Sequence, residues 1–206
     1  MSLTLYAVAR SRGLRNLWLI EELGIPCTVV QVTPAEAASH PRLGQINPSR
    51  QVPAIDDDGL ALSESFAINL YLARKHGGPL AAKDAAEDAR ILMWTFWVVT
   101  AVEPEAIQVL YNRVGKPEPE RVPARADQAM KALEQPLAML EGELARSPYL
   151  VGNRFTVADL NVAAVLVWLK SAGEDMNRWP NIKRWLDAAW NRPAAARVWE
   201  RRVKGI

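Results

Sequence analysis

The first 77 residues alternate between short strand-like segments and helical segments. Apolar residues occupy every second position from Leu3 to Val8, which predicts a strand. From Leu14 to Leu23 they recur three and four positions apart, which predicts a helix that Gly24 ends. Cys27 to Val32 is rich in β-branched residues and predicts a second strand. The two strands should be parallel, because a helix connects them.

An irregular, proline-containing stretch from Pro34 to Ser49 has room for at most a short helix. Two apolar segments, Val52 to Ile55 and Leu60 to Leu62, then flank an Asp-Gly pair at Asp58-Gly59, which predicts a hairpin. A further helix is predicted from Glu64 to Lys75. The residues expected on its buried side are Ala67, Leu70 and Tyr71.

From Asp84 onward nearly every segment has helical spacing. One long helix is predicted from Asp84 to Asn112, which Pro104 can break, and a second from Pro123 to Ala145, with a kink at Pro136. Further helices are expected to begin near Thr156, Asn181 and Ala194. We therefore expect two domains, residues 1–77 and 84–206, joined by a linker over residues 78–83.

Composition narrows the class of protein. The chain has 206 residues, of which 50% are hydrophobic and 23% charged, which excludes a disordered or fibrous chain. It lacks the run of about 20 apolar residues that spans a bilayer, and Met1 to Tyr6 does not resemble the start of a signal peptide. The single cysteine excludes an intrachain disulfide. We expect a soluble, cytoplasmic protein that does not bind a membrane.

Several chemistries lack the residues they need. His40 and His76 are the only histidines and no cysteine cluster exists, so we expect no metal site. No phosphate-binding loop, Gly-x-Ser-x-Gly or Cys-x-x-Cys motif is present, and Cys27 falls in a predicted strand, as expected for an inert buried thiol. The net charge is only +2, so the basic tail is interpreted as a solvated helix end and not as a nucleic-acid site. Its cations are Arg197, Arg201, Arg202 and Lys204.

Four segments, in this order and spacing, carry a family resemblance. They are Ser11-Arg12-Gly13-Leu14-Arg15 leading into Leu17 to Pro26, then Asn47 to Ala54, then Leu62 to Ile68, and finally Gly152-Asn153-Arg154-Phe155-Thr156-Val157-Ala158-Asp159. Together they resemble the cytosolic glutathione S-transferases, especially the bacterial and fungal serine-type members. Each motif alone is weak, but the resemblance covers essentially the whole chain.

The resemblance implies a thioredoxin-like N-terminal domain, with the order β-α-β-α-β-β-α, followed by an all-helical C-terminal domain. It implies an enzyme that activates the thiol of glutathione as a thiolate for attack on a small hydrophobic electrophile, as in detoxification. Glutathione would be a co-substrate, with no further cofactor, and the family is usually a homodimer. Two alternatives stay open. One is a non-catalytic interaction module, and the other is a glutathione-dependent isomerase, dehalogenase or peroxidase.

Ser11 is the candidate catalytic residue. It lies where the first strand ends and the first helix begins, so its hydroxyl and the helix dipole can both favour a thiolate. By itself this position favours an ordinary helix N-cap, and it is the resemblance that reverses this in favour of a thiol-activating hydroxyl. Tyr6 is the rival, but it lies within the strand pattern and so suits core packing. Arg12 either adds a positive field beside the sulfur or is an exposed first-turn residue.

The resemblance also implies binding residues for the rest of glutathione. Pro53 would be cis, so that the Val52 N–H and C=O pair with the cysteinyl backbone like an added strand. Gln51 and His40 would contact the glycyl end, although both also suit an exposed loop.

At the opposite end of the tripeptide, Ser65 would bind the γ-glutamyl carboxylate at a helix N-terminus, and Glu64 would hold the amino group. The alternative there is an ordinary helix cap. Thr156 to Asp159 is interpreted as a structural capping box, and Trp94 and Trp97 as a pair on one helix face.

Overall fold

A computed structural model describes residues 2–204 of the chain. These residues form two compact units: residues 2–81 together with residues 191–204, and Ala82–Trp190. The last helix therefore belongs with the first unit. This grouping differs from the expected division at residues 84–206, in which that helix is part of the second domain.

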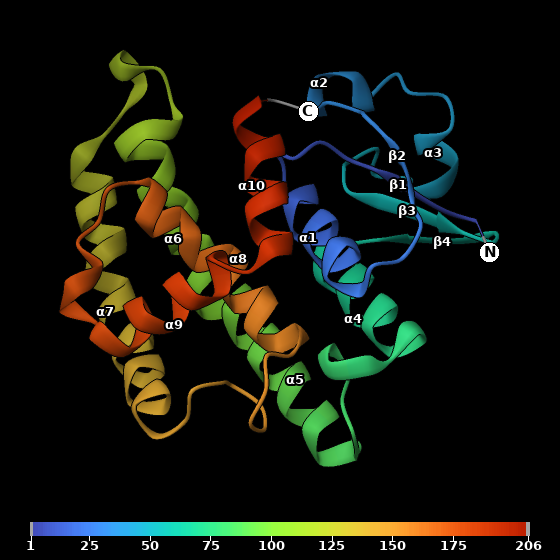
Figure 1. The fold of residues 1–206 in the computed structure, drawn as a ribbon. Coiled ribbons are helices and arrows are strands. Elements are labelled where there is room, and N and C mark those ends of the chain that lie inside the picture. Colours follow the sequence, from blue (N-terminus) through green and yellow to red (C-terminus); the bar gives the residue numbers. More distant parts are fainter. Residues whose placement is uncertain (1, 205–206) are drawn as a thin grey trace. The chain divides into compact units, whose positions relative to one another are not determined.

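The first unit is built on a four-stranded mixed sheet (Figure 1). Its strands are β1 (Leu3–Tyr6), β2 (Thr28–Val30), β3 (Ala54–Asp57) and β4 (Leu60–Ser63), in the order β2-β1-β3-β4. β1 is parallel to β2 and antiparallel to β3, and β3 is antiparallel to β4. The thioredoxin-like arrangement is thus confirmed.

Helices cover both faces of this sheet (Figure 1). On one side α1 (Gly13–Leu23) packs against α4 (Ser65–His76). On the other lie α2 (Pro34–Ala37) and α3 (Leu43–Ile46), so the expectation of at most one short helix here was wrong. A Thr33–Glu36 capping box stabilises the start of α2, and a buried apolar residue holds α3 against the core. These contacts allow two helices to form in so short a stretch of chain. The cluster beneath them contains Tyr6, Val32, Ala37, Leu43, Ile46 and Ala54.

The predicted hairpin turn is confirmed and one predicted helix face is corrected. Asp58 (φ 50°) and Gly59 (φ 92°) both adopt positive φ in the hairpin between β3 and β4. The buried side of α4 is not the predicted one, since Ala67, Leu70 and Tyr71 are only partly buried. The buried residues are Ser65, Phe66, Ile68, Asn69, Leu72 and Ala73. This face includes the polar Asn69, so hydrophobic spacing alone did not identify it.

The helix α10 (Pro193–Lys204) packs along α1 (Figure 1). Arg197 and Arg201 both pair with Glu21, at 2.9 and 3.0 Å. Arg192, just before α10, donates two hydrogen bonds of 2.7 Å to the Glu22 carboxylate. Two of the four cations of the basic tail, Arg197 and Arg201, are therefore ion-paired to α1, and these contacts explain why α10 is grouped with α1.

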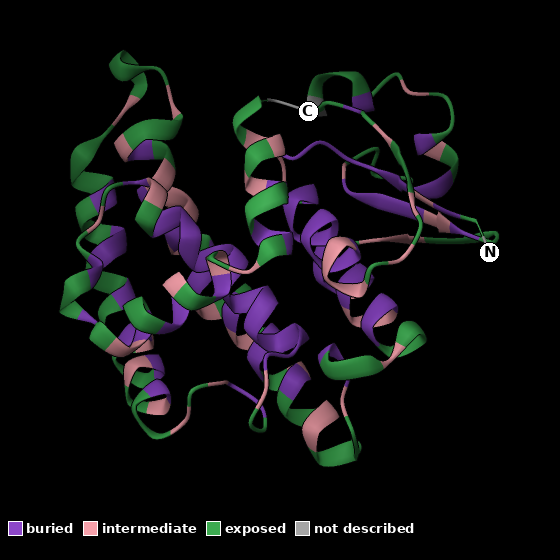
Figure 2. Cartoon of the chain, viewed as in Figure 1, coloured by how far each residue is buried: buried purple, intermediate pink, exposed green. Residues whose placement is uncertain are grey.

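The second unit is entirely helical. It contains α5 (Ala85–Trp97), α6 (Glu103–Leu110), α7 (Pro123–Arg146), α8 (Val157–Ser171) and α9 (Pro180–Trp190). α8 contacts α5, α6 and α9 and is buried from Val157 to Leu169 (Figure 2). The family-level fold of a thioredoxin-like domain plus helices is therefore present, with α8 as the core helix of the second unit.

The long predicted helix is interrupted before Pro104. A π-helical turn, Val98–Val102, separates α5 from α6, and Pro104 lies in the first turn of α6. Proline has no N–H to donate in a helix interior, but in a first turn none is needed. In α7, by contrast, the helix continues through Pro136.

The Trp94 and Trp97 rings meet edge-to-face with their centroids 5.1 Å apart, as their spacing predicts.

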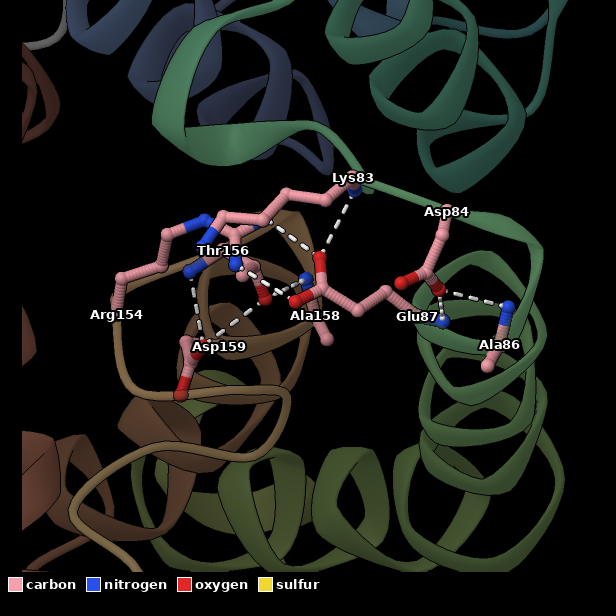
Figure 3. A network of polar contacts seen from close by, with 8 residues as sticks. All are labelled: Lys83, Asp84, Ala86, Glu87, Arg154, Thr156, Ala158 and Asp159. Atoms are coloured by element: carbon pink, nitrogen blue, oxygen red, sulfur yellow. Dashed lines mark hydrogen bonds and ion pairs between the residues drawn. The ribbon is translucent and has the colours of Figure 1, made fainter.

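Hydrogen bonds tie the start of α5 to the segment before α8 (Figure 3). Asp84 caps α5 through the N–H groups of Ala86 and Glu87. Glu87 accepts two hydrogen bonds from the Arg154 guanidinium, at 2.9 and 2.7 Å. Thr156 and Asp159 form the predicted capping box. Burial raises the pKa of the Asp159 carboxyl, and hydrogen bonds from Leu150, Thr156 and Trp185 oppose that rise.

Within residues 2–204, no helix is both long enough and apolar enough to cross a bilayer.

We expect Glu87→Gln to remove a pH-dependent part of the stability. The Arg154 side chain, with the Lys83 N–H, lowers the pKa of Glu87 from 4.5 to about 2. A carboxyl with a depressed folded-state pKa stabilises the fold above its unfolded pKa and loses that effect as the pH falls through its folded pKa. The difference in free energy of unfolding between wild type and variant should therefore be largest above pH 4.5 and should shrink as the pH falls toward 2. Denaturant unfolding at several pH values measures this, and Arg154→Met should remove the same dependence. A difference that stays constant from neutral pH to pH 2 would contradict the assignment.

Candidate functional site

Strand pairing brings three chain segments to one edge of the sheet. Tyr6, the last residue of β1, pairs with Ala54, the first residue of β3. Ala54 also pairs with Ser63, the last residue of β4. The exit of β1, the entry to β3 and the exit of β4 therefore lie side by side. These segments carry Ser11, Val52 and Ser65, the predicted residues for the sulfur, the backbone and the carboxylate of glutathione.

The Ser11 turn is held by a close approach between α1 and the end of β1. A Cβ on Gly13 would lie 2.5 Å from the Ala7 Cβ, so only glycine fits there. Ser11 Oγ accepts a hydrogen bond from the Gly13 N–H at 3.0 Å and donates one to the Val8 carbonyl at 2.7 Å. The hydroxyl oxygen is thereby fixed at the N-terminus of α1. Sequence reasoning did not single out Gly13.

The C-terminal end of α10 contacts the same turn. Arg202 Nη1 donates to the Ala9 carbonyl at 3.3 Å, and Arg10 donates to the carbonyls of Arg202 and Val203. Burial and the nearby Arg10 charge lower the pKa of Arg202. Two guanidinium groups therefore lie at this turn: Arg10 directly precedes Ser11 in the sequence, and Arg202 contacts the Ala9 carbonyl, so the turn is electropositive. The predicted Arg12 is exposed and precedes α1 directly.

Tyr6 and His40 lie on the α2–α3 side of the sheet. The Tyr6 residue is 7% exposed and belongs to the buried cluster there. The His40 ring meets it edge-on at 5.7 Å, and its Nδ1 accepts the Leu43 N–H at 3.1 Å. Because Nδ1 accepts this bond, Nε2 is the ring nitrogen that can donate. Tyr6 thus packs as a core residue, while His40 keeps an N–H donor.

The segment before β3 is held by Asn47, which is buried. Its side-chain amide donates to the Gln51 carbonyl at 2.8 Å, and its Oδ1 accepts from the Ser49 N–H at 3.1 Å. The Val52–Pro53 peptide is cis, as the resemblance implies. No hydrogen bond joins the Val52 backbone to any residue among 2–204. The Gln51 side chain is exposed. An extended ligand backbone therefore has a donor and an acceptor to pair with at Val52.

The first turn of α4 has no side-chain cap. Glu64 precedes it with φ 68° and ψ 111°, a backbone conformation that costs energy in a residue other than glycine. Ser65 is buried, and its Oγ accepts a hydrogen bond of 3.1 Å from Arg15 Nη1. Arg15 was not among the predicted site residues, because an arginine in an apolar helix pattern gives no sign of the serine it will meet.

Cys27 is separate from this edge. It immediately precedes β2 instead of lying within a strand as predicted, and it is half-buried. It lines a surface cavity of about 260 Å³ with residues of α1 and α10. Burial raises the pKa of its thiol to about 11, so it is protonated and unreactive at neutral pH. A reactive sulfur at the Ser11 turn would have to come from a ligand.

Two family models match most of the chain. Residues 1–74 match the glutathione S-transferase N-terminal domain, and residues 123–188 match the C-terminal domain. Glutathione S-transferase 3 of Zea mays is 31% identical over 93% of this chain and 90% of its own length. The chain belongs to the glutathione S-transferase family.

Other members of the glutathione S-transferase family align over nearly their full length. Glutathione S-transferase GstB of Escherichia coli is 29% identical over 95% of this chain and 97% of its own. A theta-class glutathione S-transferase from Xanthomonas axonopodis pv. citri, solved with glutathione bound, is 29% identical, with a TM-score of 0.87 over 95% of this chain and 96% of its own. The fold and family implied by the sequence motifs are thus confirmed.

We expect Gly13→Ala to destabilise the first unit by about 1–3 kcal/mol, the typical cost of overpacking. The new Cβ would meet the Ala7 Cβ at 2.5 Å and push apart the strand and helix that carry Ser11. Gly142→Ala is the matched control, because it lies on an exposed face of α7 with no atom within 4 Å of the added Cβ. That change should stabilise by about 0.5–1 kcal/mol. Thermal unfolding measures both variants. Equal changes in stability for Gly13→Ala and Gly142→Ala would contradict the close approach of α1 to the end of β1.

Proposed function

We propose that this chain binds glutathione along the sheet edge formed by residues 7–11, 51–53 and 64–65, and transfers it to a small hydrophobic electrophile. The observation that carries the proposal is the unpaired Val52 backbone. Its N–H and C=O lie at the entry of β3, where the cysteinyl backbone of glutathione can add as a short strand. Family membership supports the same substrate.

The two ends of the tripeptide have complementary partners in the proposed site. The γ-glutamyl carboxylate binds the uncapped first turn of α4, with help from the Ser65 hydroxyl. Glu64 supplies a negative charge for the amino group. Gln51 and the Nε2–H of His40 bind the glycyl carboxylate, and Arg12 adds positive charge near the sulfur.

Ser11 activates the thiol in this proposal. In the structure the Ser11 hydroxyl donates to the Val8 carbonyl. When glutathione binds, the hydroxyl rotates so that its proton points toward the sulfur instead. The Gly13 N–H keeps the oxygen in place during that rotation. The buried, core-packed position of Tyr6 favours Ser11 over Tyr6 as the donor.

Ionisation of the glutathione thiol accounts for only a limited part of the rate enhancement. A free thiol with a pKa near 8.5 is only about 3% thiolate at pH 7, so full ionisation gains at most about thirtyfold. A hydrogen bond to a charged acceptor contributes about 1.5–3 kcal/mol, which corresponds to lowering the pKa by about one to two units. Positioning the electrophile beside the sulfur supplies the remainder.

Retention on immobilised glutathione, followed by an assay with a generic aryl halide, tests the proposal. Binding with turnover supports a transferase. Retention without turnover would favour a different glutathione-dependent reaction, and no retention would favour an interaction module and overturn the proposal.

We expect Ser11→Ala to raise the pKa of bound glutathione by about one to two units, because the hydrogen bond to the thiolate is lost. Ultraviolet absorbance of the thiolate, titrated against pH, measures the shift. The activity lost at pH 7 should be largely recovered at high pH, where the thiol ionises unaided.

Tyr6→Phe is the control for this titration, and it should leave the thiol pKa unchanged. If Tyr6→Phe shifted the pKa of the glutathione thiol and Ser11→Ala did not, Tyr6 and not Ser11 would be the residue that activates the thiol. Ser11→Thr keeps a hydroxyl and should retain part of the effect.

We further propose that the chain is a cytoplasmic homodimer. Met93 and Phe96 are exposed on α5, and Val99 is exposed in the π-helical turn that follows it. Each is three positions from the next, a spacing that makes consecutive side chains neighbours on a helix surface. Clustered exposed apolar residues of this kind are typical of a protein interface, and the family resemblance makes a second copy of the chain the proposed partner.

We expect light scattering to give twice the chain mass of 22.9 kDa for the wild type. Phe96→Glu should shift the population toward the monomer, because it places a charge in the apolar patch. Val203→Glu is a matched control, since both residues are 64% exposed. A monomeric wild type would contradict this proposal without affecting the glutathione site.

A further inference from the structure

Arg15 lies in the first turn of α1 and is almost completely buried, with 1% of its surface exposed. Its Nη1 donates to Ser65 Oγ at 3.1 Å. Its guanidinium also stacks over the Phe66 ring, 4.3 Å from the ring centre. A full positive charge is therefore held directly behind the first turn of α4.

Two buried asparagines hold this arrangement in place. The Asn16 side-chain amide donates to the Ser65 carbonyl and to Asn69 Oδ1, both at 2.8 Å. The Asn69 amide in turn donates to the Arg15 carbonyl at 3.4 Å. Both asparagines are fully buried. The first turns of α1 and α4 are thus joined by a polar seam of Arg15, Asn16, Ser65 and Asn69.

The Arg15 bond determines what the Ser65 hydroxyl can do. Arginine is always a donor, so Ser65 Oγ must act as its acceptor. The hydroxyl proton is then left for a different acceptor, and the structure gives it none among residues 2–204. An acceptor supplied by a ligand completes the hydrogen bonding of Ser65.

Electrostatics specify the charge of that ligand. The N-terminus of a helix carries a partial positive charge. The Arg15 guanidinium behind the same turn adds a second positive group. An anion placed at the first turn of α4 is attracted by both groups, whereas a neutral group is not.

We propose that Arg15 is a positioning residue for the γ-glutamyl carboxylate of glutathione. It turns the Ser65 hydroxyl proton toward the carboxylate and adds its charge from behind the helix N-terminus. This inference rests on the proposed function, in which glutathione binds at this edge. Arg15 does not contact the ligand and acts through Ser65.

The experiment compares two ligands on the full-length chain by titration calorimetry. One is glutathione, and the other is 4-aminobutyryl-cysteinylglycine, which lacks only the γ-glutamyl carboxylate. The variants are Arg15→Met, Ser65→Ala and the double variant. Arg74→Met is the matched control, because Arg74 lies in the last, exposed turn of the same helix α4.

Arg15→Met should weaken glutathione binding by about tenfold to a hundredfold, the range for loss of a charge-assisted hydrogen bond. Binding of the decarboxylated ligand should change little. Arg15→Met should weaken glutathione binding less in the Ser65→Ala variant than in the wild type, since Arg15 acts through the Ser65 hydroxyl. Arg74→Met should bind both ligands like the wild type.

Equal losses for both ligands, or additive losses in the double variant, would show a purely structural role and overturn the inference while leaving glutathione binding intact. A wild type that binds neither ligand would overturn the proposed function together with it. If Arg15→Met does not fold, Arg15→Lys replaces it, because lysine cannot reproduce the planar contact with Phe66 and Ser65. An unchanged preference for glutathione over the decarboxylated ligand in Arg15→Lys would also overturn the inference.

Discussion

The antiparallel insertion of β3 between β1 and β4 is the constraint on which the first unit depends. Because Ala54 pairs with both Tyr6 and Ser63, two strands leave the sheet at the place where a third enters it. Each departing strand leads into a helix, so the N-termini of α1 and α4 lie at the same edge. The entering strand leaves an unpaired backbone at Val52 between them. One register therefore sets both the electropositive character of this edge and the unpaired backbone that the proposed peptide ligand would meet.

Polar contacts, and not apolar packing alone, hold the elements that carry this edge. The first turns of α1 and α4 are joined by a buried seam that includes Asn16 and Asn69. Buried polar groups of this kind need specific partners, so they permit fewer alternative packings than apolar side chains do. Asn47 does the same for the segment before Val52. The positions of the proposed ligand-binding groups are thus fixed by hydrogen bonds with defined geometry.

The tail helix α10 adds a second support behind the Ser11 turn. Its arginines pair with Glu21, while Arg202 and Arg10 connect its last turn to the backbone just before Ser11. A change in the final residues of the chain can therefore affect a turn near its beginning. The second unit is organised independently around α8, whose first turn is capped by Thr156 and Asp159.

The sequence alone determined the element order, the hairpin at Asp58-Gly59, the capping box at Thr156 and the family, because these depend on local spacing and on turn residues with special backbone needs. It also singled out Ser11, Val52 and Ser65 as the proposed ligand-binding residues, through motifs that resemble those of the family. Only the tertiary structure decided that Asn69 faces inward, that Gly13 is required by Ala7, that α10 packs on α1, and that Arg15 lies behind Ser65. Each of these depends on a partner far away in the chain, and neither hydrophobic periodicity nor helix propensity contains information about such a partner.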